Sequence, residues 1–253
     1  MTLLERFKLD GKVAVITGAS SGLGVAFATG LAEAGADIAI CARRADKLEQ
    51  TKRDVEALGR RCVAVTADVS NPEDCTRVIE ETVAALGRVD VLVNNAGMGT
   101  AVPATRETPE QFRVVIDVNL NGSYWMAQAC ARVMAPGSSI VNIGSVLGST
   151  TAGLPQAAYS SSKAAIIGLT RDLAVQWTGR KGIRVNAIAP GFFPSEMTEQ
   201  YPDGYLESQQ ARLPAGRPGE AEELTAAVLF LASDASSYVT GILLPVDGGM
   251  LAT

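Results

Sequence analysis

A tyrosine, a lysine and a serine of this chain have a spacing that suits proton transfer. Tyr159 and Lys163 lie four positions apart in the segment AAYSSSKAAIIGLT, and Ser145 lies fourteen positions before the tyrosine. On a helix, positions i and i+4 share one face and lie roughly 6 Å apart along the axis. A lysine ammonium beside a phenol favours the phenolate, so we expect the pKa of Tyr159 to fall from about 10 toward neutrality. Tyr159 would then be a usable general acid at neutral pH.

A Tyr–Lys pair at this spacing could also lie on a solvent-exposed helix face with no catalytic role. Other parts of the sequence are needed to distinguish the two interpretations. The chain contains no histidine. This excludes a Ser-His-Asp hydrolase, a histidine base and a histidine metal ligand, and we expect no metal site. Without histidine, tyrosine is the side chain best suited to donate a proton near neutral pH.

The composition of the 253 residues is typical of an α/β protein. It is 47% hydrophobic but only 5% aromatic, as expected for β-branched buried strands packed against helices with small residues. The net charge of −5 argues against nucleic acid or an anionic membrane as the main partner. No stretch reaches 18 uncharged apolar residues, the N-terminal segment lacks the apolar run of a signal peptide, and the four cysteines form no CxxC pair. We therefore expect a cytoplasmic protein with reduced thiols.

Short apolar runs alternate with longer amphipathic segments along the chain. Strands are predicted at 12–17, 36–41, 62–67, 89–94, 138–143, 183–189 and 242–247. Helices are predicted at 23–34, 45–58, 72–86, 109–134, 158–178 and 220–232. This series predicts one α/β domain over residues 1–253, with a parallel sheet covered by helices on both faces. The segment 191–219 breaks the pattern after a strand, where a lid over a ligand site belongs.

The turn after the first predicted strand is rich in glycine. Gly18, Gly22 and Gly24 lie between strand 12–17 and helix 23–34. Glycines there permit a tight turn and let the backbone approach a pyrophosphate at the helix N-terminus. Such turns also take glycines for geometry alone, and the spacing here is GxxxGxG rather than the commoner GxGxxG. Three glycines in the first βαβ unit nevertheless favour nucleotide binding.

The end of the second predicted strand indicates which dinucleotide binds. A carboxylate there would bind the ribose 2′-hydroxyl of NAD(H), whereas an arginine accommodates the 2′-phosphate of NADP(H). The sequence at this point is ICARR, ending in Arg43 and Arg44, and Asp37 comes too early. We predict that Arg43, and with it Arg44, binds the 2′-phosphate, which favours NADP(H) and leaves NAD(H) as the alternative. The arginines could also be a surface pair at a helix N-terminus.

Together these segments resemble the classical short-chain dehydrogenase/reductase family over essentially the whole chain. The matching motifs are TGASSGLG (17–24), ADV (67–69), NNAG (94–97), VNLNG (118–122), GS (144–145), YSSSK (159–163), NAIAPGFF (186–193) and VDGG (246–249). Each is common alone, but their order and spacing are specific. The resemblance implies a Rossmann-like three-layer fold with a seven-stranded parallel sheet, assembled as a homotetramer.

The resemblance also implies a role for each matching position. Ser145 resembles the residue that hydrogen-bonds the substrate oxygen, and Tyr159 resembles the proton donor. Lys163 resembles the residue that holds the nicotinamide ribose and lowers the pKa of the tyrosine. Asn119 resembles the asparagine that holds a water in a proton relay, although an asparagine can also simply kink or cap a helix. The remaining matches are expected cofactor contacts: Gly18, Ser20, Ser21, Gly22, Leu23, Gly24, Asp68, Val69, Asn95, Ala96, Gly97, Pro190, Gly191, Phe193 and Ser195.

We therefore expect an NADP(H)-dependent oxidoreductase that interconverts a small-molecule ketone or aldehyde and an alcohol. A serine hydroxyl and a phenol would meet the oxygen that becomes negative as hydride reaches carbon. Phe192 and Phe193 favour an apolar substrate. The alternatives are an NAD-dependent sugar-acid or polyol dehydrogenase, a nucleotide-sugar epimerase, which is usually a longer chain, and a catalytically idle dinucleotide sensor. A sensor has no need of the four filled positions at Asn119, Ser145, Tyr159 and Lys163.

Overall fold

The computed structural model describes residues 2–194, 196, 204–210 and 213–252. Within these residues, seven parallel strands form one sheet in the order β3-β2-β1-β4-β5-β6-β7, which confirms the predicted sheet. The strands are β1 (Val13–Thr17), β2 (Asp37–Ala42), β3 (Cys62–Thr66), β4 (Val91–Asn94), β5 (Ser139–Ile143), β6 (Arg184–Pro190) and β7 (Leu243–Val246). Their ends lie within two residues of the predicted ones.

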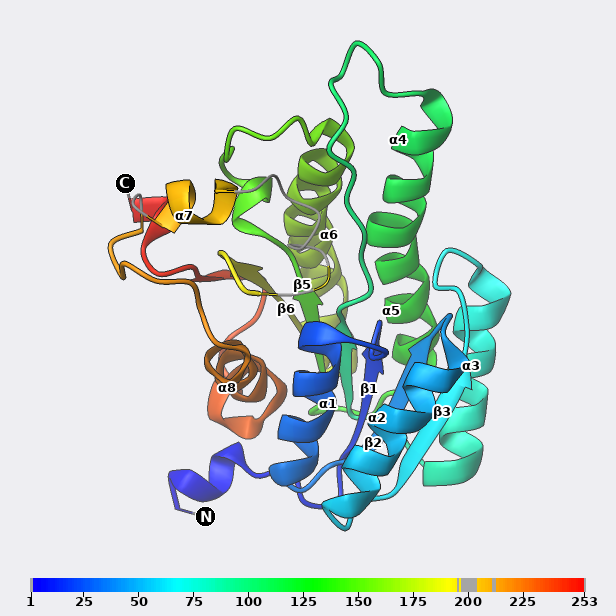
Figure 1. Ribbon diagram of the computed structural model, residues 1–253. Helices are drawn as coiled ribbons and strands as arrows, with labels where there is room; N and C mark the ends of the chain where they lie inside the picture. Colours follow the sequence, from blue (N-terminus) through cyan, green and yellow to red (C-terminus); the bar gives the residue numbers. More distant parts are fainter. Residues whose placement is uncertain (1, 195, 197–203, 211–212, 253) are drawn as a thin grey trace.

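Helices cover both faces of the sheet, as predicted (Figure 1). On one face lie α1 (Gly22–Glu33), α2 (Ala45–Ala57) and α8 (Ala221–Ala232), with α1 packed between the other two. On the other face lie α3 (Pro72–Leu86), α5 (Gly122–Val133) and α6 (Ala157–Lys181). The shorter elements are α4 (Pro109–Ile116), α7 (Tyr205–Gln210), η1 (Leu4–Phe7), η3 (Val146–Gly148), η5 (Asp234–Ser236) and η6 (Met250–Ala252).

Local sequence explains where several helices begin and end. The Asn71 side chain accepts a hydrogen bond from the N–H of Glu73 at the start of α3, and Pro72 supplies the first helical position. Gly87 ends the same helix in the left-handed conformation, with φ of 88°. Before α4, Thr108 and Gln111 form a reciprocal capping box. These signals are local, so the sequence pattern predicts these boundaries well.

The helix predicted at 109–134 is divided by a π-helical turn, η2 (Asp117–Asn121), between α4 and α5. The N–H of Gly122 bonds to the carbonyl of Asp117, five residues earlier. Such a turn accommodates one extra residue in a helix and often marks a functional site. The Asn119 side chain in this turn bonds to the Met98 backbone and to Ser162. The predicted helix is therefore continuous from Pro109 to Val133, but contacts with distant residues anchor a π-helical turn within it.

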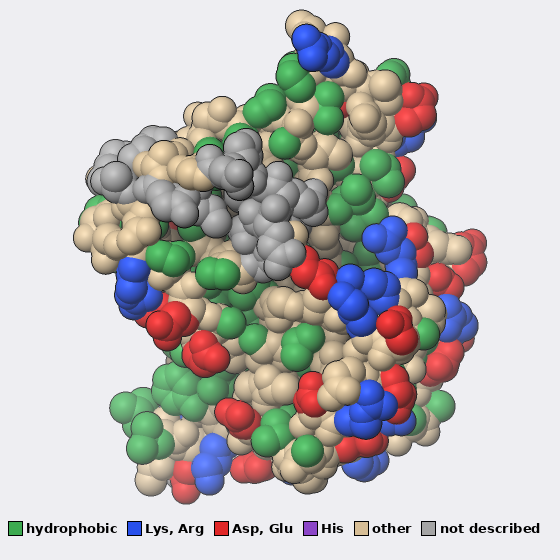
Figure 2. Space-filling view, viewed as in Figure 1, with side chains coloured by type: hydrophobic (Ala, Val, Ile, Leu, Met, Phe, Trp, Pro, Cys, Tyr) green, Lys and Arg blue, Asp and Glu red, His purple; other side chains and the backbone are tan. Residues whose placement is uncertain are grey.

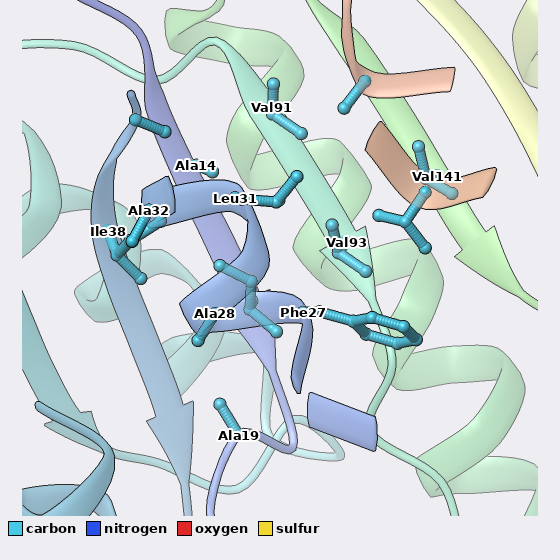
Figure 3. Packing of buried hydrophobic residues seen from close by; sticks show 14 of the residues in the cluster. Ala14, Ala19, Phe27, Ala28, Leu31, Ala32, Ile38, Val91, Val93 and Val141 are labelled. Carbon is cyan, nitrogen blue, oxygen red and sulfur yellow. The ribbon is translucent and has the colours of Figure 1, made fainter. Parts of the chain in front are cut away.

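Apolar side chains from the sheet and the helices form the core. Figure 3 shows Phe27, Ala28 and Leu31 of α1 beside Val91 and Val93 of β4. All five are at most 1% exposed. Burial of each larger side chain contributes about 1.5–3 kcal/mol, while the alanine allows the helix to approach the sheet closely. This packing fixes the N-terminus of α1 above the end of β1.

The direction in which strands are added reverses between β1 and β4, because the chain first builds β1-β2-β3 and then continues on the other side of β1. In open parallel sheets, ligands bind outside the carboxyl ends of the strands at such a switch point. Here the two strands are joined at that end. The Thr17 hydroxyl accepts from the N–H groups of Asn95 and Ala96, at 3.0 and 2.9 Å.

Candidate active site

A cleft of about 480 Å³ lies at the carboxyl ends of β1 to β4. Its walls are the segments that follow these strands and the first turn of α1. Most of the predicted cofactor residues line it: Gly18, Ser20, Ser21, Gly22, Leu23, Gly24, Arg43, Arg44, Asp68, Val69, Asn95, Ala96 and Gly97. The fold thus gathers residues from four βα connections around one elongated cavity.

The glycine-rich turn forms the floor of this cleft. Gly18 has φ of +68°, and a Cβ there would lie 2.8 Å from Cα of Ala96. A Cβ on Gly24 would overlap the Gly18 carbonyl oxygen. The Asn95 amide donates to the carbonyls of Thr17 and Gly18, at 2.9 and 3.3 Å, and so holds the turn against β4. The turn leads into the N-terminus of α1, where unpaired N–H groups favour an anion, so the cradle fits a dinucleotide diphosphate.

Two basic side chains from the end of β2 and the start of α2 lie beside two serines of the glycine-rich turn. We call this group the cationic corner: Arg44, Lys47, Ser20 and Ser21. The Arg44 guanidinium donates to the hydroxyls of Ser20 (3.0 and 3.2 Å) and Ser21 (2.7 Å). Arg44 and Lys47 both contact the carboxylate of Glu196, at 3.0 and 2.7 Å. The cationic corner therefore binds one carboxylate of the chain itself and has the donor set of an anion site.

The other predicted contacts at this end are arranged differently. Arg43 lines the cleft with an exposed side chain, which has no hydrogen-bond or ion-pair partner among residues 2–194, 196, 204–210 and 213–252. Asp68 accepts from the N–H and hydroxyl of Ser70, at 3.0 and 2.7 Å, and its own N–H donates to Asp74. Val69 is buried in the cleft wall. Asp68 and Val69 thus form a rigid edge of the cleft, whereas Arg43 is free to orient toward a ligand.

Lys163 is buried beside Tyr159 on α6. Its ammonium lies 5.6 Å from the centroid of the Tyr159 ring and donates to the carbonyl of Ile143 at 2.8 Å. The side chain is only 5% exposed, and this burial lowers the pKa of Lys163 to about 8. No other acceptor of Lys163 lies in the described part of the chain, so two of its three N–H groups are available to a ligand.

Ser145 follows β5 and begins the short turn η3. Its Oγ accepts from the N–H of Leu147 at 3.1 Å. The hydroxyl hydrogen has no acceptor among the residues that the structure describes, so it can donate to a substrate oxygen. Val146 and Leu147 belong to the same buried cluster as Tyr159, which places Ser145 near the start of α6.

Asn119 connects the cleft to these residues. Its amide donates to the Met98 carbonyl and to the Ser162 hydroxyl, both at 2.9 Å, and its oxygen accepts from the Met98 N–H at 2.8 Å. A Cβ on Gly97 would lie 3.4 Å from the Asn119 oxygen and 3.5 Å from the Lys163 nitrogen. Gly97 also lines the cleft. Gly97 therefore places Asn119 and Lys163 next to the inner end of the cleft.

Four predicted contacts near β6 lie elsewhere or cannot be placed. Pro190 ends β6, and the N–H of Gly191 donates to the carbonyl of Val246 at 2.9 Å. Phe193 is buried and lines a separate pocket of about 140 Å³. Ser195 lies outside the described residues. Cofactor contact by these four residues stays a prediction.

Three charged or polar residues of the site escaped the sequence analysis. Lys47 lies one helical turn after Arg44, and this spacing is a signal that could have identified it. Nothing in the sequence connects Glu196 to the cationic corner, because it belongs to the irregular segment after β6. Gln156 directly precedes the first residue of α6, three positions before Tyr159, and no motif in the sequence identified it.

Gln156 is a mostly buried polar residue beside Tyr159. The residue is 6% exposed, and its side-chain amide makes no hydrogen bond with any residue that the structure describes. A Cβ on Gly99 would lie 3.3 Å from the Tyr159 ring and 3.8 Å from Nε2 of Gln156. The amide can both donate and accept a hydrogen bond, so Gln156 is suited to bind a ligand beside Tyr159.

Other kinds of site have less support. In the described residues, no group of cysteine and carboxylate side chains is arranged to hold a metal ion. The same residues contain no helix with the length and apolarity needed to cross a bilayer. Acidic and basic side chains are interspersed on the face in Figure 2, rather than gathered in a basic field. Cys41, Cys62, Cys75 and Cys130 are buried free thiols.

Known proteins resemble this chain along its length. A family profile described as Enoyl-(Acyl carrier protein) reductase matches residues 18–251. The chain is 40% identical over 255 residues to 2-dehydro-3-deoxy-D-gluconate 5-dehydrogenase from Dickeya dadantii strain 3937, covering 99% of both chains. It is also 40% identical over 247 residues to a 3-oxoacyl-(acyl-carrier-protein) reductase from Thermotoga maritima, covering 96% of this chain and 99% of that one.

A solved structure shows the same architecture. The crystal structure of a gluconate 5-dehydrogenase from Burkholderia cenocepacia J2315, in complex with NADP and tartrate, matches with a TM-score of 0.92 and 36% identity. The match covers 100% of both chains. The seven-stranded sheet described above is thus shared, end to end, with a structure that holds a dinucleotide.

Proposed function

The chain belongs to the short-chain dehydrogenase/reductase family, and we propose that it is an NADP(H)-dependent enzyme that interconverts a ketone or aldehyde and an alcohol. Membership makes it an oxidoreductase that acts on CH–OH and C=O groups. The proposal adds the cofactor preference, the proton donor and the class of substrate. The observation that carries it is Gly97, which lines the cleft and lies next to both Asn119 and Lys163.

The cationic corner supports NADP(H) as the cofactor. Arg44 and Lys47 converge on one anion, and Arg43 adds a further positive charge without a partner in the described residues. No carboxylate occupies the last position of β2, where an NAD(H) enzyme would use one for the ribose hydroxyl. The related gluconate 5-dehydrogenase structure contains NADP. These observations favour a 2′-phosphate over a 2′-hydroxyl.

The chemistry then follows from the residues at the inner end of the cleft. The bound nicotinamide supplies or accepts the hydride. Ser145 donates its free hydroxyl hydrogen to the substrate oxygen, and Tyr159 donates the proton that completes the alcohol. The buried ammonium of Lys163 binds the ribose with its free N–H groups and places positive charge beside the phenol. Asn119 positions the segment after β4 against α6 and holds the water of the proton relay.

The substrate side combines one polar group with apolar walls. The buried amide of Gln156 offers a donor and an acceptor beside Tyr159, so it suits a hydroxyl or carbonyl next to the reacting carbon. Leu147 and Phe192 pack in the same cluster as Tyr159 and favour a carbon skeleton against them. A hydroxylated ketone of moderate size meets both requirements.

A second candidate is an NAD(H)-dependent sugar-acid or polyol dehydrogenase. The observation that favours it is the Gln156 amide, together with 40% identity to 2-dehydro-3-deoxy-D-gluconate 5-dehydrogenase. The two candidates share their chemistry and differ in cofactor and in substrate polarity. A catalytically idle sensor is not favoured, since the buried Lys163 and a Ser145 hydroxyl without an acceptor in the described residues would have no role in it.

The decisive experiment is cofactor oxidation by the purified protein with NADPH and NADH in parallel. The panel contains simple ketones, hydroxyketones, diketones, quinones and keto sugar acids. Turnover with NADPH at least tenfold above that with NADH supports the proposal. Turnover with NADH alone would support carbonyl–alcohol interconversion but would make NAD(H) the cofactor in place of NADP(H). A protein that binds neither cofactor in a titration contradicts the proposal.

The remaining expectations concern the surroundings of the site. We propose a homotetramer in the cytoplasm, built from one domain of residues 1–253. The exposed apolar side chains on α4, α5 and α6 support contact with a second copy; Val175 is 85% exposed and Val133 is 47% exposed. The segment 191–219 is proposed to cover the substrate, although residues 195, 197–203 and 211–212 of it lie outside the described residues.

A further inference from the structure

The cationic corner is occupied by an anion from the chain itself. One carboxylate oxygen of Glu196 lies 3.0 Å from Arg44 Nη2, and the other lies 2.7 Å from Lys47 Nζ. Glu196 comes 152 positions after Arg44, so this contact joins the segment after β6 to the start of α2. Glu196 also lines the cleft. A ligand that enters this end of the cleft meets the carboxylate directly.

The donors that bind Glu196 also suit a phosphate. A guanidinium, an ammonium and a serine hydroxyl bind phosphate oxygens through charge-assisted hydrogen bonds, as Arg44, Lys47 and Ser21 bind the carboxylate of Glu196. Hydrogen bonds from Lys47, Arg44 and Ser21 lower the pKa of Glu196 to about 2, so this residue is negative throughout the physiological pH range. A carboxylate and a phosphate on the same two cations repel each other. The two anions therefore exclude one another.

We propose that Glu196 competes with the cofactor's 2′-phosphate for Arg44 and Lys47, and thereby limits the preference for NADP(H). This inference depends on the proposed NADP(H) function and adds the residue that sets the strength of that preference. In the cofactor-free protein the carboxylate holds both cations, and it leaves them when a 2′-phosphate binds. NAD(H) has a 2′-hydroxyl in place of the 2′-phosphate, and this hydroxyl can donate a hydrogen bond to a carboxylate. NAD(H) can therefore bind without displacing Glu196 from Arg44 and Lys47.

The exposure of the three side chains sets the expected size of the effect. Arg44, Lys47 and Glu196 are 42%, 43% and 45% exposed. Ion pairs of this kind are weak because water and salt screen them, so the carboxylate can be displaced. We expect Glu196→Gln to strengthen binding of a 2′-phosphate about three- to tenfold.

The test is isothermal titration calorimetry of the full chain with 2′,5′-ADP and 5′-AMP, which isolates the 2′-phosphate from hydride transfer. Glu196→Gln is compared with Glu80→Gln, which removes the same charge from an exposed position of α3. We expect Glu196→Gln to bind 2′,5′-ADP about three- to tenfold more tightly, with 5′-AMP affinity unchanged. Glu80→Gln should match the wild type for both ligands.

The outcomes separate this inference from the proposed function. If the wild type prefers 2′,5′-ADP over 5′-AMP but Glu196→Gln does not strengthen that preference, the competition is absent and the cofactor proposal stands. If neither protein prefers 2′,5′-ADP, both ideas fail. Lys47→Met provides a second test, since Glu196→Gln should have a smaller effect in that background. An equal effect in both backgrounds contradicts competition for a shared cation.

Discussion

The ammonium of Lys163 lies over the ring of Tyr159, 5.6 Å from its centroid, and is held there by the carbonyl of Ile143. The four-residue spacing on α6 places both side chains on one helical face, and the end of β5 supplies the acceptor that fixes the lysine. The pair is therefore positioned by the packing of α6 against the sheet as well as by the helix itself.

Tyr159→Phe should abolish turnover while cofactor binding persists. The substitution removes only the hydroxyl of a buried ring, so the fold and the cleft are retained. Loss of a general acid should lower kcat about 10²- to 10⁴-fold. Steady-state kinetics and a fluorescence titration with NADPH measure the two effects. Tyr238→Phe, at a fully exposed position, is the control. Near-normal turnover in Tyr159→Phe would exclude this residue as the proton donor.

Lys163 should make the stability of the cofactor-free protein depend on pH. Burial lowers its pKa from 10.5 to about 8, so between these values the unfolded chain binds more protons than the folded one. The free energy of unfolding therefore rises with pH through this range, and the cost of burying the charge is fully present below pH 8. Relative to Lys163→Met, the wild type should gain on the order of 3 kcal/mol from pH 7.5 to 10.5.

Urea unfolding at several pH values checks this prediction, because the difference between wild type and variant cancels the other titrating groups. Lys8→Met removes an exposed lysine and should show a constant difference from the wild type across the same range. A constant difference for Lys163→Met as well would show that its ammonium is not destabilised by burial.

Arg44→Ala should reduce the preference for NADPH over NADH. Arg44 contacts both serines of the glycine-rich turn and directs its guanidinium into the cationic corner. Loss of a charge-assisted contact with phosphate should lower kcat/KM for NADPH about ten- to a hundredfold and leave NADH within threefold. Arg43→Asp should act in the same direction. Arg53→Ala, on the exposed face of α2, is the matched control. An unchanged cofactor ratio in both Arg44→Ala and Arg43→Asp would contradict the NADP(H) proposal.

Gln156→Leu should affect only substrates with a polar group next to the carbonyl. The buried amide has no partner among the described residues, so the substrate is expected to complete its hydrogen bonding. KM for a hydroxyketone should rise about three- to tenfold, while KM for the matching simple ketone and the Kd for NADPH stay unchanged. Gln176→Leu, on the exposed side of the same helix, controls for general effects on α6. Equal KM changes for the two ketones would indicate a packing defect instead.

The sequence alone determined the class of fold and predicted where the candidate reacting groups lie along it. Short continuous apolar runs predicted the seven strands, because the central strands of a parallel sheet are buried on both faces. Amphipathic segments predicted most helices, because a period of 3.6 reflects burial of one helical face. Gly18 and Gly24 predicted the tight turn after β1 from local demands: Gly18 has a positive φ, and a Cβ on Gly24 would overlap the Gly18 carbonyl oxygen. The spacing of Tyr159 and Lys163 predicted their contact from helical geometry alone.

Only the tertiary structure decided which distant side chains meet. The contact of Glu196 with Arg44 and Lys47, the π-helical turn at Asn119 and the burial of Gln156 beside Tyr159 all depend on how separate elements pack. The sequence pattern indicates which face of an element is buried, but it does not indicate which other element packs against that face. Long-range polar contacts arise from that packing, so the charge balance of the candidate cofactor site is decided only by the tertiary structure.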